Sequence, residues 1–214
     1  MTDDNTLDIA SVDEVLSTAR SVRRKLDFSR AVEPAVLYEC INVSTQAPTG
    51  LGGESWRFVV VTESDRKRQI ADLYRSVLAD LVRLRGLEIK STQRSLADRL
   101  HEMPALIFVC AIGSPPAEGV AGQVAFYGSI LPSAWSLMLA LRARNLGATW
   151  TTLLSSRQED VARILQVPGG VTQTVMLPVA YTKGATLRRA ERLDARQVTF
   201  WNAWGNAQEP IELE

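Results

Sequence analysis

Histidine and cysteine are scarce in this chain. His101 is the single histidine, and the two cysteines, Cys40 and Cys110, lie in apolar stretches without a CxxC motif. One histidine excludes multi-histidine metal sites and leaves little basis for a Ser-His-Asp triad. Two separated cysteines argue against a disulfide framework or a zinc site and favour a reducing compartment. We expect both thiols to be small core hydrophobes and His101 to be partly exposed at the end of a helix.

The chain also lacks net charge and long apolar runs. Its 24 Lys and Arg residues balance 24 Asp and Glu residues, whereas proteins that bind nucleic acid through bulk electrostatics are normally basic. The longest apolar run lies near Trp135–Leu141, well short of the ~20 residues that span a membrane. Residues Met1–Ala10 are acidic and polar, unlike a leader peptide. We therefore expect a cytoplasmic protein with no nucleic-acid or membrane partner.

Phosphate-binding glycine motifs are missing as well. No Gly-x-Gly-x-x-Gly follows a β-rich stretch and no Walker loop is present, which argues against a Rossmann or P-loop site. With 46% hydrophobic and 22% charged residues over 214 positions, the composition is that of a globular protein. We expect a flexible N-terminus over residues 1–10, one domain over 11–205 and a tail over 206–214.

Hydrophobic spacing predicts helices and strands in an irregular order. Ser11 with Glu14, and Ser156 with Glu159, form capping-box patterns that each indicate a helix start. Gly147 is expected just past the end of an apolar, buried helix. The expected helices cover 11–18, 34–46, 64–85, 129–145 and 156–165, and the expected strands cover 56–62, 105–112, 149–154 and 175–181. Because no regular βαβ alternation appears, the order favours an α+β fold.

Three segments carry residue types that suit ligand binding. Arg20-Ser21-Val22-Arg23-Arg24-Lys25 holds four cations that could clamp a phosphate; alternatively, it is a solvated helix C-terminus. The glycine-rich segment 47–56 could bring backbone amides close to a flat or anionic ligand, or could simply connect a helix to a strand. The hydroxyls of 148–152 could bind the edges of a heterocycle, or could belong to a threonine-rich strand.

Taken in order, these segments resemble the FMN-dependent nitroreductase family. The chain has an Arg-Ser-Val-Arg motif near the N-terminus, an Ala-Pro-Thr loop that leads to Trp56, and a buried helix that ends in Asn-Leu-Gly. A Leu-Pro-Val-Ala-Tyr strand and a basic segment at Arg188–Leu193 follow. The resemblance covers about Val12–Trp204 and is greatest to an actinobacterial type of NAD(P)H nitroreductase. It implies a nitroreductase-like fold, with a central, mainly antiparallel sheet surrounded by helices in an intertwined homodimer.

The resemblance also implies a set of FMN-binding residues. The N-terminal basic motif would hold the FMN phosphate and ribityl chain, the Ala-Pro-Thr loop would lie against the flavin of the partner subunit, and the stretch after the buried helix would cover the isoalloxazine. The C-terminal basic segment would close on the phosphate. The residues that match these motifs are Arg20, Ser21, Val22, Arg23 or Arg24, Pro48, Thr49, Gly50, Gly52, Thr151, Thr152, Arg189 and Arg192.

One loop departs from the family pattern. Gly52, Glu54 and Ser55 stand where the family usually has Asn, Gln and Pro. The change removes a polar contact and adds a negative charge that Arg57 could pair with. This departure motivates a second hypothesis, a flavin-binding protein that stores or sequesters FMN with little turnover.

The mechanism implied by the resemblance is ping-pong hydride transfer. NADH or NADPH reduces FMN and leaves, and a nitroaromatic or quinone acceptor then takes the electrons at the same face. Because the cofactor carries the chemistry, no residue is named as catalytic. Phe200, Trp201 and Trp204 are more apolar than a free tail would be, which agrees with a C-terminal extension that wraps around the partner subunit.

Overall fold

The central feature of the computed structural model is an antiparallel sheet. The structure describes residues 7–50, 53–86 and 88–207. The strands are ordered β1-β5-β3-β2, with β4 paired to β5. All of these pairings are antiparallel, and one isolated bridge, between Gly113 and Val171, is parallel. The strands are β1 Leu26–Asp27, β2 Trp56–Val61, β3 Ala105–Ile112, β4 Leu146–Ala148 and β5 Val171–Thr182.

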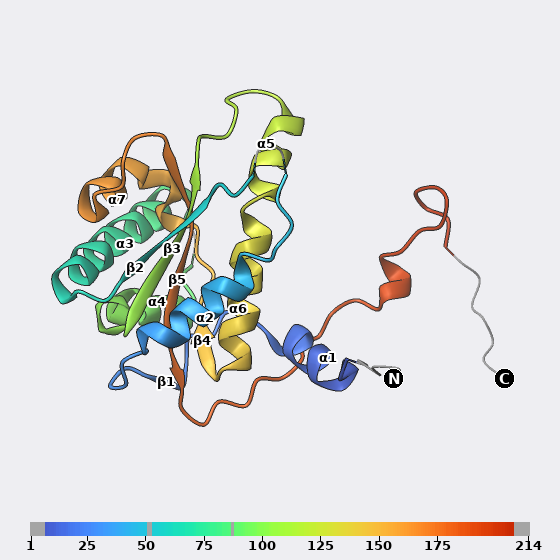
Figure 1. Ribbon diagram of the computed structural model, residues 1–214, viewed down its shortest axis with the longest axis horizontal. Coiled ribbons are helices and arrows are strands. Elements are labelled where there is room, and N and C mark those ends of the chain that lie inside the picture. The colour runs from blue at the N-terminus through green and yellow to red at the C-terminus, as the bar shows by residue number, and fades with distance from the viewer. Residues whose placement is uncertain (1–6, 51–52, 87, 208–214) are drawn as a thin grey trace, which may run out of the picture.

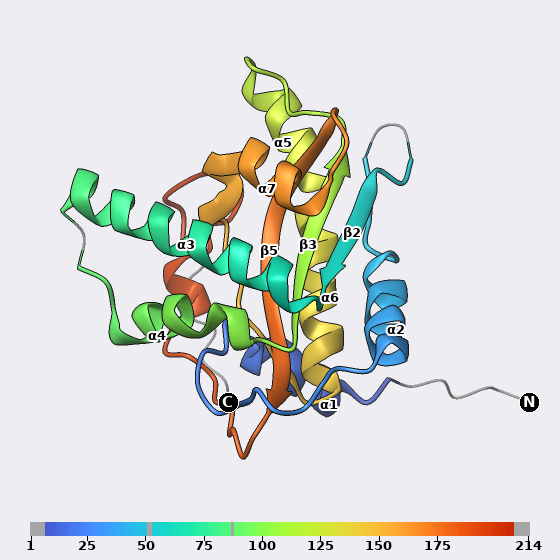
Figure 2. The same cartoon turned by 90° about the vertical axis from the view of Figure 1, so that its left-hand side faces the viewer.

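Helices cover both faces of this sheet (Figures 1 and 2). One face carries α2 and α6, and the other carries α3, α4 and α7, while α5 projects beyond the end of the sheet. The helices are α1 Ile9–Thr18, α2 Pro34–Ser44, α3 Ser64–Arg85, α4 Ser91–Arg99, α5 Val120–Gly128, α6 Leu131–Ala143 and α7 Gln158–Leu165. Short 3-10 helices cover Leu100–Glu102, Leu153–Arg157 and Ala195–Gln197. The α+β prediction is confirmed.

The two sides of β3 belong to two separate hydrophobic clusters. Ile107 and Val109 pack with α2 and α6, whereas Leu106 and Phe108 pack with α3 and α7. Burial on both faces explains why the sequence of this strand is continuously apolar instead of alternating. Cys40 and Cys110 are buried free thiols, as expected. Burial raises the pKa of Cys110 to about 12, so this thiol stays protonated.

Helix α6 owes its apolar composition to burial in the middle of the molecule. Ala134, Leu137 and Leu141 are inaccessible to solvent, as expected for a helix that packs on several sides. By length and composition, the 24-residue stretch Val120–Ala143 would suffice to cross a membrane. Packing against α2 and the sheet accounts for the apolar residues of α6, whereas Val120 and Val124 of α5 are exposed.

Both predicted helix caps were wrong, although the helices themselves are present. Helix α1 begins at Ile9, and its cap is Asp8, whose carboxylate accepts hydrogen bonds from the backbone N and the hydroxyl of Ser11. Ile9 and Ala10 therefore belong to a helix, not to a flexible terminus. Helix α7 begins at Gln158, and the Ser156 hydroxyl donates backwards to the Leu153 carbonyl. A serine in a preceding 3-10 turn can satisfy its hydroxyl locally, which removes it from the cap.

Candidate functional site

The basic segment 20–25 lies against the stretch that follows α6. The Val22 amide donates to the Ala148 carbonyl at 2.8 Å, and the Thr149 hydroxyl donates to the Val22 carbonyl at 2.8 Å. The Trp150 amide donates to Ser21 Oγ at 3.0 Å. Two of the three segments singled out in the sequence are thus side by side, although more than 120 residues separate them.

Gly147 makes this close approach possible. It lies in β4 and not just past the end of α6, so the expectation of a helix-terminal glycine was wrong. Asn145 takes the left-handed conformation there instead, with a φ of 59°. A Cβ on Gly147 would lie 2.8 Å from Leu26 Cδ2 and 3.1 Å from Val22. The glycine is therefore required by the packing of the basic segment.

The basic segment lines a cleft of about 440 Å³. We call it the cofactor cleft because the family resemblance predicts that this segment holds the FMN phosphate. Thr92 of α4 and residues 185–187 form the rest of its lining. The Nε atoms of Arg20 and Arg23 are buried and have no hydrogen-bond partner among the described residues. Buried polar atoms are usually hydrogen-bonded in proteins, so these two atoms fit an acceptor that enters the cleft. Arg24 is exposed, which favours Arg23 over Arg24 as the second arginine that would hold the phosphate together with Arg20.

The chain after β5 returns to this cleft as a strap over residues 183–189. The strap is attached at Lys25, whose carbonyl accepts from the Lys183 amide at 2.7 Å and whose Nζ donates to the Gly184 carbonyl at 3.1 Å. It is attached again where Arg189 Nε donates to Ser17 Oγ at 3.0 Å. Arg192 lies beyond the strap, is exposed, and donates to the carbonyl of the neighbouring Glu191.

The glycine-rich loop lies at another place in the molecule. The Gly50 amide donates to Ser129 Oγ at 2.9 Å, at the junction of α5 and α6, and Thr49 Oγ1 donates to the Gly53 carbonyl at 3.1 Å. A Cβ on Gly50 would come within 2.7 Å of Ser129 Oγ, so this contact requires a glycine. Pro48 and Thr49 are exposed, and Gly52 lies outside the described residues.

Arg57, behind this loop, does not pair with the Glu54 side chain as the sequence suggested. Its guanidinium donates to the backbone carbonyls of Glu54 and Trp56, at 3.2 and 2.7 Å. The ion-pair expectation was therefore wrong, because the guanidinium is bonded instead to backbone carbonyls before and at the start of β2.

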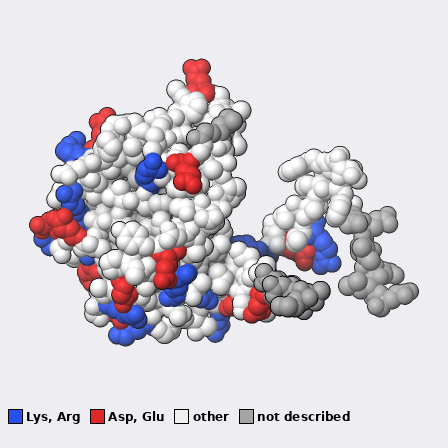
Figure 3. Space-filling model, in the orientation of Figure 1, with Lys and Arg blue, Asp and Glu red and all other residues white. Residues whose placement is uncertain are grey.

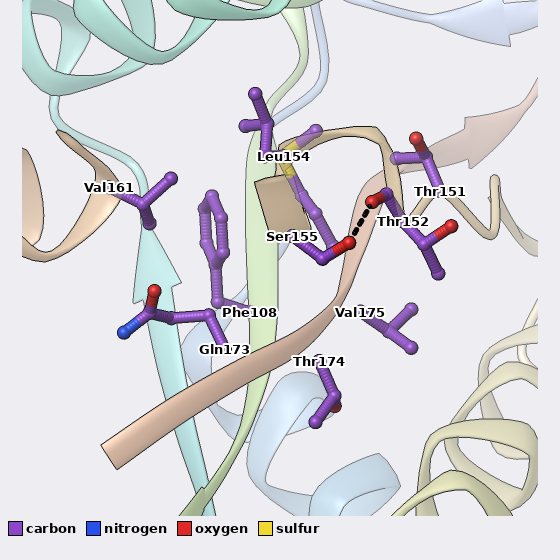
Figure 4. A pocket seen from close by; sticks show the side chains of 10 residues that line it. Phe108, Thr151, Thr152, Leu154, Ser155, Val161, Gln173, Thr174 and Val175 are labelled. Carbon is purple, nitrogen blue, oxygen red and sulfur yellow. Dashed lines mark hydrogen bonds between the residues drawn. The ribbon is translucent and has the colours of Figure 1, made fainter. Parts of the chain in front are cut away.

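Thr151 and Thr152 follow the basic-segment contact and lie between the sheet and α3. The expected strand over 149–154 was wrong: Thr151 forms a single bridge with Met176, and a 3-10 helix begins at Leu153. The Tyr74 and Thr151 hydroxyls are 3.4 Å apart, and Thr152 is exposed with its carbonyl bonded to the Ser155 hydroxyl (Figure 4). The cavity drawn there measures about 10 Å³, which is enough for about one water molecule and too small for a cofactor.

Sequence reasoning missed the lining from Thr92 and residues 185–187. Nothing in the local sequence of these residues differs from an ordinary helix start or loop, since their role comes from tertiary contact. A metal centre was not expected, and none of the described residues form a group of three His, Cys, Asp or Glu side chains that could hold one.

The comparison with known families decides the classification. Residues 16–181 match the sequence model of the Nitroreductase family. The chain belongs to the nitroreductase family. This match covers the basic segment, Gly50, Gly147, strands β1 to β4 and all of β5 except Thr182. It confirms the predicted family and fold class, whereas the actinobacterial type stays a prediction.

Individual proteins similar to this chain include a deiodinase and a nitroreductase-like protein. Iodotyrosine deiodinase 1 of Rattus norvegicus is 28% identical over 200 residues, which cover 86% of this chain and 67% of that protein. The crystal structure of oxidized iodotyrosine deiodinase bound to FMN and 3-iodo-L-tyrosine is similar, with a TM-score of 0.66 and 21% identity. The match covers 87% of this chain and 98% of that chain. The crystal structure of a nitroreductase-like family protein from Bacillus cereus matches with a TM-score of 0.66 and 21% identity. This match covers 95% of this chain and 100% of that chain. At these identities the two structures support the fold alone.

Proposed function

We propose that this member of the nitroreductase family is a cytoplasmic, FMN-dependent NAD(P)H oxidoreductase. The observation that carries the proposal is the cofactor cleft, where Arg20 and Arg23 each present a buried Nε without an acceptor. A phosphate monoester carries nearly two negative charges at neutral pH. Because the chain has no net charge, an anion of this kind must be held by local cations.

The residues of the cleft fit FMN in chemical type. Arg20 and Arg23 would hold the phosphate, and the Ser21–Trp150 hydrogen bond would keep the basic segment against the stretch that leads to Thr151 and Thr152. The strap would close the cleft through Thr186 and Leu187, with Arg189 and Arg192 as proposed further phosphate contacts. The chemistry that FMN supplies when bound is two-electron transfer, from NADH or NADPH to a nitroaromatic or quinone in a ping-pong sequence. The protein then needs to bind and orient the reactants and to exclude water, and no side chain is required as an acid or base.

We propose that the site is completed by a second copy of the chain. Gly50 is bonded to Ser129 at the α5–α6 junction, and together with Pro48 and Thr49, which precede it in the loop, it would meet the flavin of the partner subunit. The chain after the strap runs away from the body in Figure 1 and carries Trp204, which is 90% exposed. An apolar groove of about 660 Å³ is lined by α5 and α6 residues, Ser21 and Trp150. Apolar surface of this kind on a globular chain is typical of a subunit interface.

Fluorescence titration with FMN tests the cofactor assignment. Removing a charge-assisted hydrogen bond costs about 1.5–3 kcal/mol, so Arg20→Ala should weaken FMN binding roughly ten- to a hundredfold. Riboflavin, which lacks the phosphate, should lose far less affinity in the same variant. Arg85→Ala, an exposed arginine at the end of α3, is the matched control and should bind FMN like the wild type. Equal FMN affinity for wild type and Arg20→Ala would contradict the proposal.

Anaerobic stopped-flow of the FMN-loaded protein separates turnover from storage. Bleaching of the flavin by NADH or NADPH, followed by reoxidation with a nitroaromatic or quinone, supports the oxidoreductase. FMN binding without reduction would instead support a sequestering protein, which the unusual Gly52, Glu54 and Ser55 motivate. The deiodinase relative favours one further acceptor class, halogenated aromatics. Release of halide in the same assay would identify that chemistry.

A further inference from the structure

The lining of the cofactor cleft carries positive charge and no carboxylate. It includes the four cations Arg20, Arg23, Arg24 and Lys25, and it contains neither Asp nor Glu. None of the ion pairs among the residues that the structure describes involves these four side chains. On α3, by contrast, exposed arginines pair with an aspartate three residues away. The charge of the cleft is therefore available to bound anions.

The FMN phosphate would balance only part of this charge. A phosphate monoester carries nearly two negative charges at neutral pH, and Arg20 and Arg23, whose buried Nε atoms have no partner among the described residues, are sufficient to neutralise it. Lys25 is engaged with the strap, because its Nζ donates to the Gly184 carbonyl at 3.1 Å. Arg24 is exposed on the wall of the same cleft, and its charge is left over.

Arg188 places a second unpaired cation beside this cleft. It directly follows Leu187, which lines the cleft, and it is exposed. No ion pair among the described residues includes it. Its neighbour Arg189 is bonded to Ser17 Oγ and is less free to bind an anion. Arg24 and Arg188 are thus accessible from solvent, so an anion that they bind can enter and leave while the cofactor stays in place.

The two candidate reductants differ in one group that arginine recognises. NADPH carries a phosphate at the 2′ position of its adenosine ribose, where NADH has a hydroxyl. A guanidinium matches phosphate oxygens with two parallel hydrogen bonds. In doubly wound dinucleotide-binding folds, a carboxylate accepts from the 2′-hydroxyl of NAD, whereas an arginine accommodates the 2′-phosphate of NADP. The lining of the cofactor cleft offers arginines and no carboxylate, and this chemistry suits NADPH.

We propose that Arg24 and Arg188 bind the 2′-phosphate of NADPH and give this protein a preference for NADPH over NADH. The inference rests on the proposed function, because it names the reductant of the same flavin site. Exposed arginines suit a reactant that must leave before the acceptor enters. The partly buried Arg20 and Arg23 suit a cofactor that remains bound.

Calorimetric titration of the FMN-loaded protein with adenosine 2′,5′-bisphosphate tests the binding step without turnover. Adenosine 3′,5′-bisphosphate is the control probe, because it carries the same charge on the neighbouring hydroxyl. The 2′,5′ isomer should bind at least about tenfold more tightly, the effect of one charged hydrogen bond. Arg24→Gln should remove most of this difference. Arg85→Gln, which changes an exposed arginine at the end of α3, is the matched control and should preserve it.

Anaerobic stopped-flow of the FMN-loaded protein provides the second readout, the ratio of flavin reduction by NADPH to reduction by NADH at low nucleotide concentration. The wild type should favour NADPH by at least about tenfold, and Arg24→Gln should lower the ratio by about the same factor. Arg188→Gln should lower it in the same direction. FMN titration of both variants shows whether either arginine serves the cofactor instead, and we expect their FMN affinity to stay within about twofold of the wild type.

Each contrary result has a defined meaning. Equal affinity for the two bisphosphates, equal reduction by NADH and NADPH, or an unchanged ratio in Arg24→Gln overturns the inference, and reduction of the flavin in the same experiment leaves the proposed function standing. Loss of FMN affinity in Arg24→Gln, as large as that in Arg20→Ala, assigns Arg24 to the FMN phosphate and also overturns the inference. If FMN does not bind, or if neither nucleotide reduces it, the proposed function fails and this inference fails with it.

Discussion

At the scale of single residues, Tyr181 links β5 to the start of α2. Its hydroxyl donates to Glu33 Oε2 at 2.6 Å, and the Arg30 guanidinium lies 3.5 Å above its ring. The hydrogen bond lowers the pKa of Glu33 below its ordinary 4.5, and the same contact raises the pKa of Tyr181 above 10.0. Both shifts stabilise the folded state when Glu33 is ionised and Tyr181 is protonated.

The pH dependence of Tyr181→Phe follows from these two shifts. The wild type should be more stable than the variant by a constant amount between pH 4.5 and 10.0. The difference should shrink as pH falls through the lowered pKa of Glu33 and as pH rises through the raised pKa of Tyr181. Urea unfolding from a pH below the lowered pKa of Glu33 to a pH above the raised pKa of Tyr181 measures the difference. A difference that stays the same at both extremes would show that the contact contributes only packing.

At the same scale, substitution of Gly147 should change both the stability of the fold and the binding of FMN. Gly147→Ala adds a Cβ within 2.8 Å of Leu26 and 3.1 Å of Val22, and overpacking of this kind costs roughly 1–3 kcal/mol. Because Val22 is bonded to Ala148, displacement of the basic segment should also weaken FMN binding. Gly169→Ala, where a Cβ meets no atom within 4 Å, is the control. Urea unfolding measures the stability of both variants, and FMN titration measures their affinity for the cofactor. If Gly147→Ala and Gly169→Ala have the same stability and the same FMN affinity, the packing role of Gly147 is excluded.

At the scale of elements, α6 is a central helix of the hydrophobic core. It packs on α2 and on β4, and it belongs to the hydrophobic cluster that contains Ile107 and Val109 of β3. The side chain of Leu137 in this helix is inaccessible to solvent. Leu137→Ala should destabilise the protein by about 2–5 kcal/mol, through lost burial and the cavity left behind. Leu84→Ala in α3, where the side chain is 77% exposed, should change stability by less than about 0.5 kcal/mol. Chemical denaturation checks both, and similar losses would mean that α6 is not the core element.

At the scale of the whole molecule, charge and apolar surface are distributed differently. Lys and Arg are interspersed with Asp and Glu on the face shown in Figure 3, so this face has no strong field of one sign. Exposed apolar side chains occur on several elements, and those of α1, α5 and the C-terminal segment include Ile9, Val120, Trp201 and Trp204. Phe200 and Trp204 contact each other at 4.9 Å, but both remain exposed on the single chain.

The expected consequence is a homodimer with reciprocal C-terminal segments. Sedimentation velocity should give twice the mass of one chain. Trp201→Ser combined with Trp204→Ser should weaken the dimer at least about tenfold, since each buried aromatic side chain contributes roughly 1.5–3 kcal/mol. Val43→Ser, an exposed apolar residue of α2, is the comparison. A monomeric wild type would exclude the two-chain site.

The sequence by itself determined those features that depend on local physics. The bounds of α3 and β3 agree with prediction, because α3 has a strong amphipathic stripe that ends at Gly86, with a φ of 60°, and β3 is a short continuous apolar run. The family motifs likewise located the basic segment. These signals lie within one element or one contiguous motif, so no tertiary contact is needed to interpret them.

Only the tertiary structure decided which side chains meet. Gly147 has the local sequence of a helix end but serves as a contact surface for Val22 and Leu26. Thr149–Leu154 is β-rich in composition but does not form a continuous strand. It makes separate hydrogen bonds with Ser21 and Val22, one bridge with Met176, and a 3-10 helix that begins at Leu153. Thr92 and residues 185–187 complete the cofactor cleft without any local signal. Long-range packing and close approach set these positions, and neither is encoded in the periodicity of a single segment.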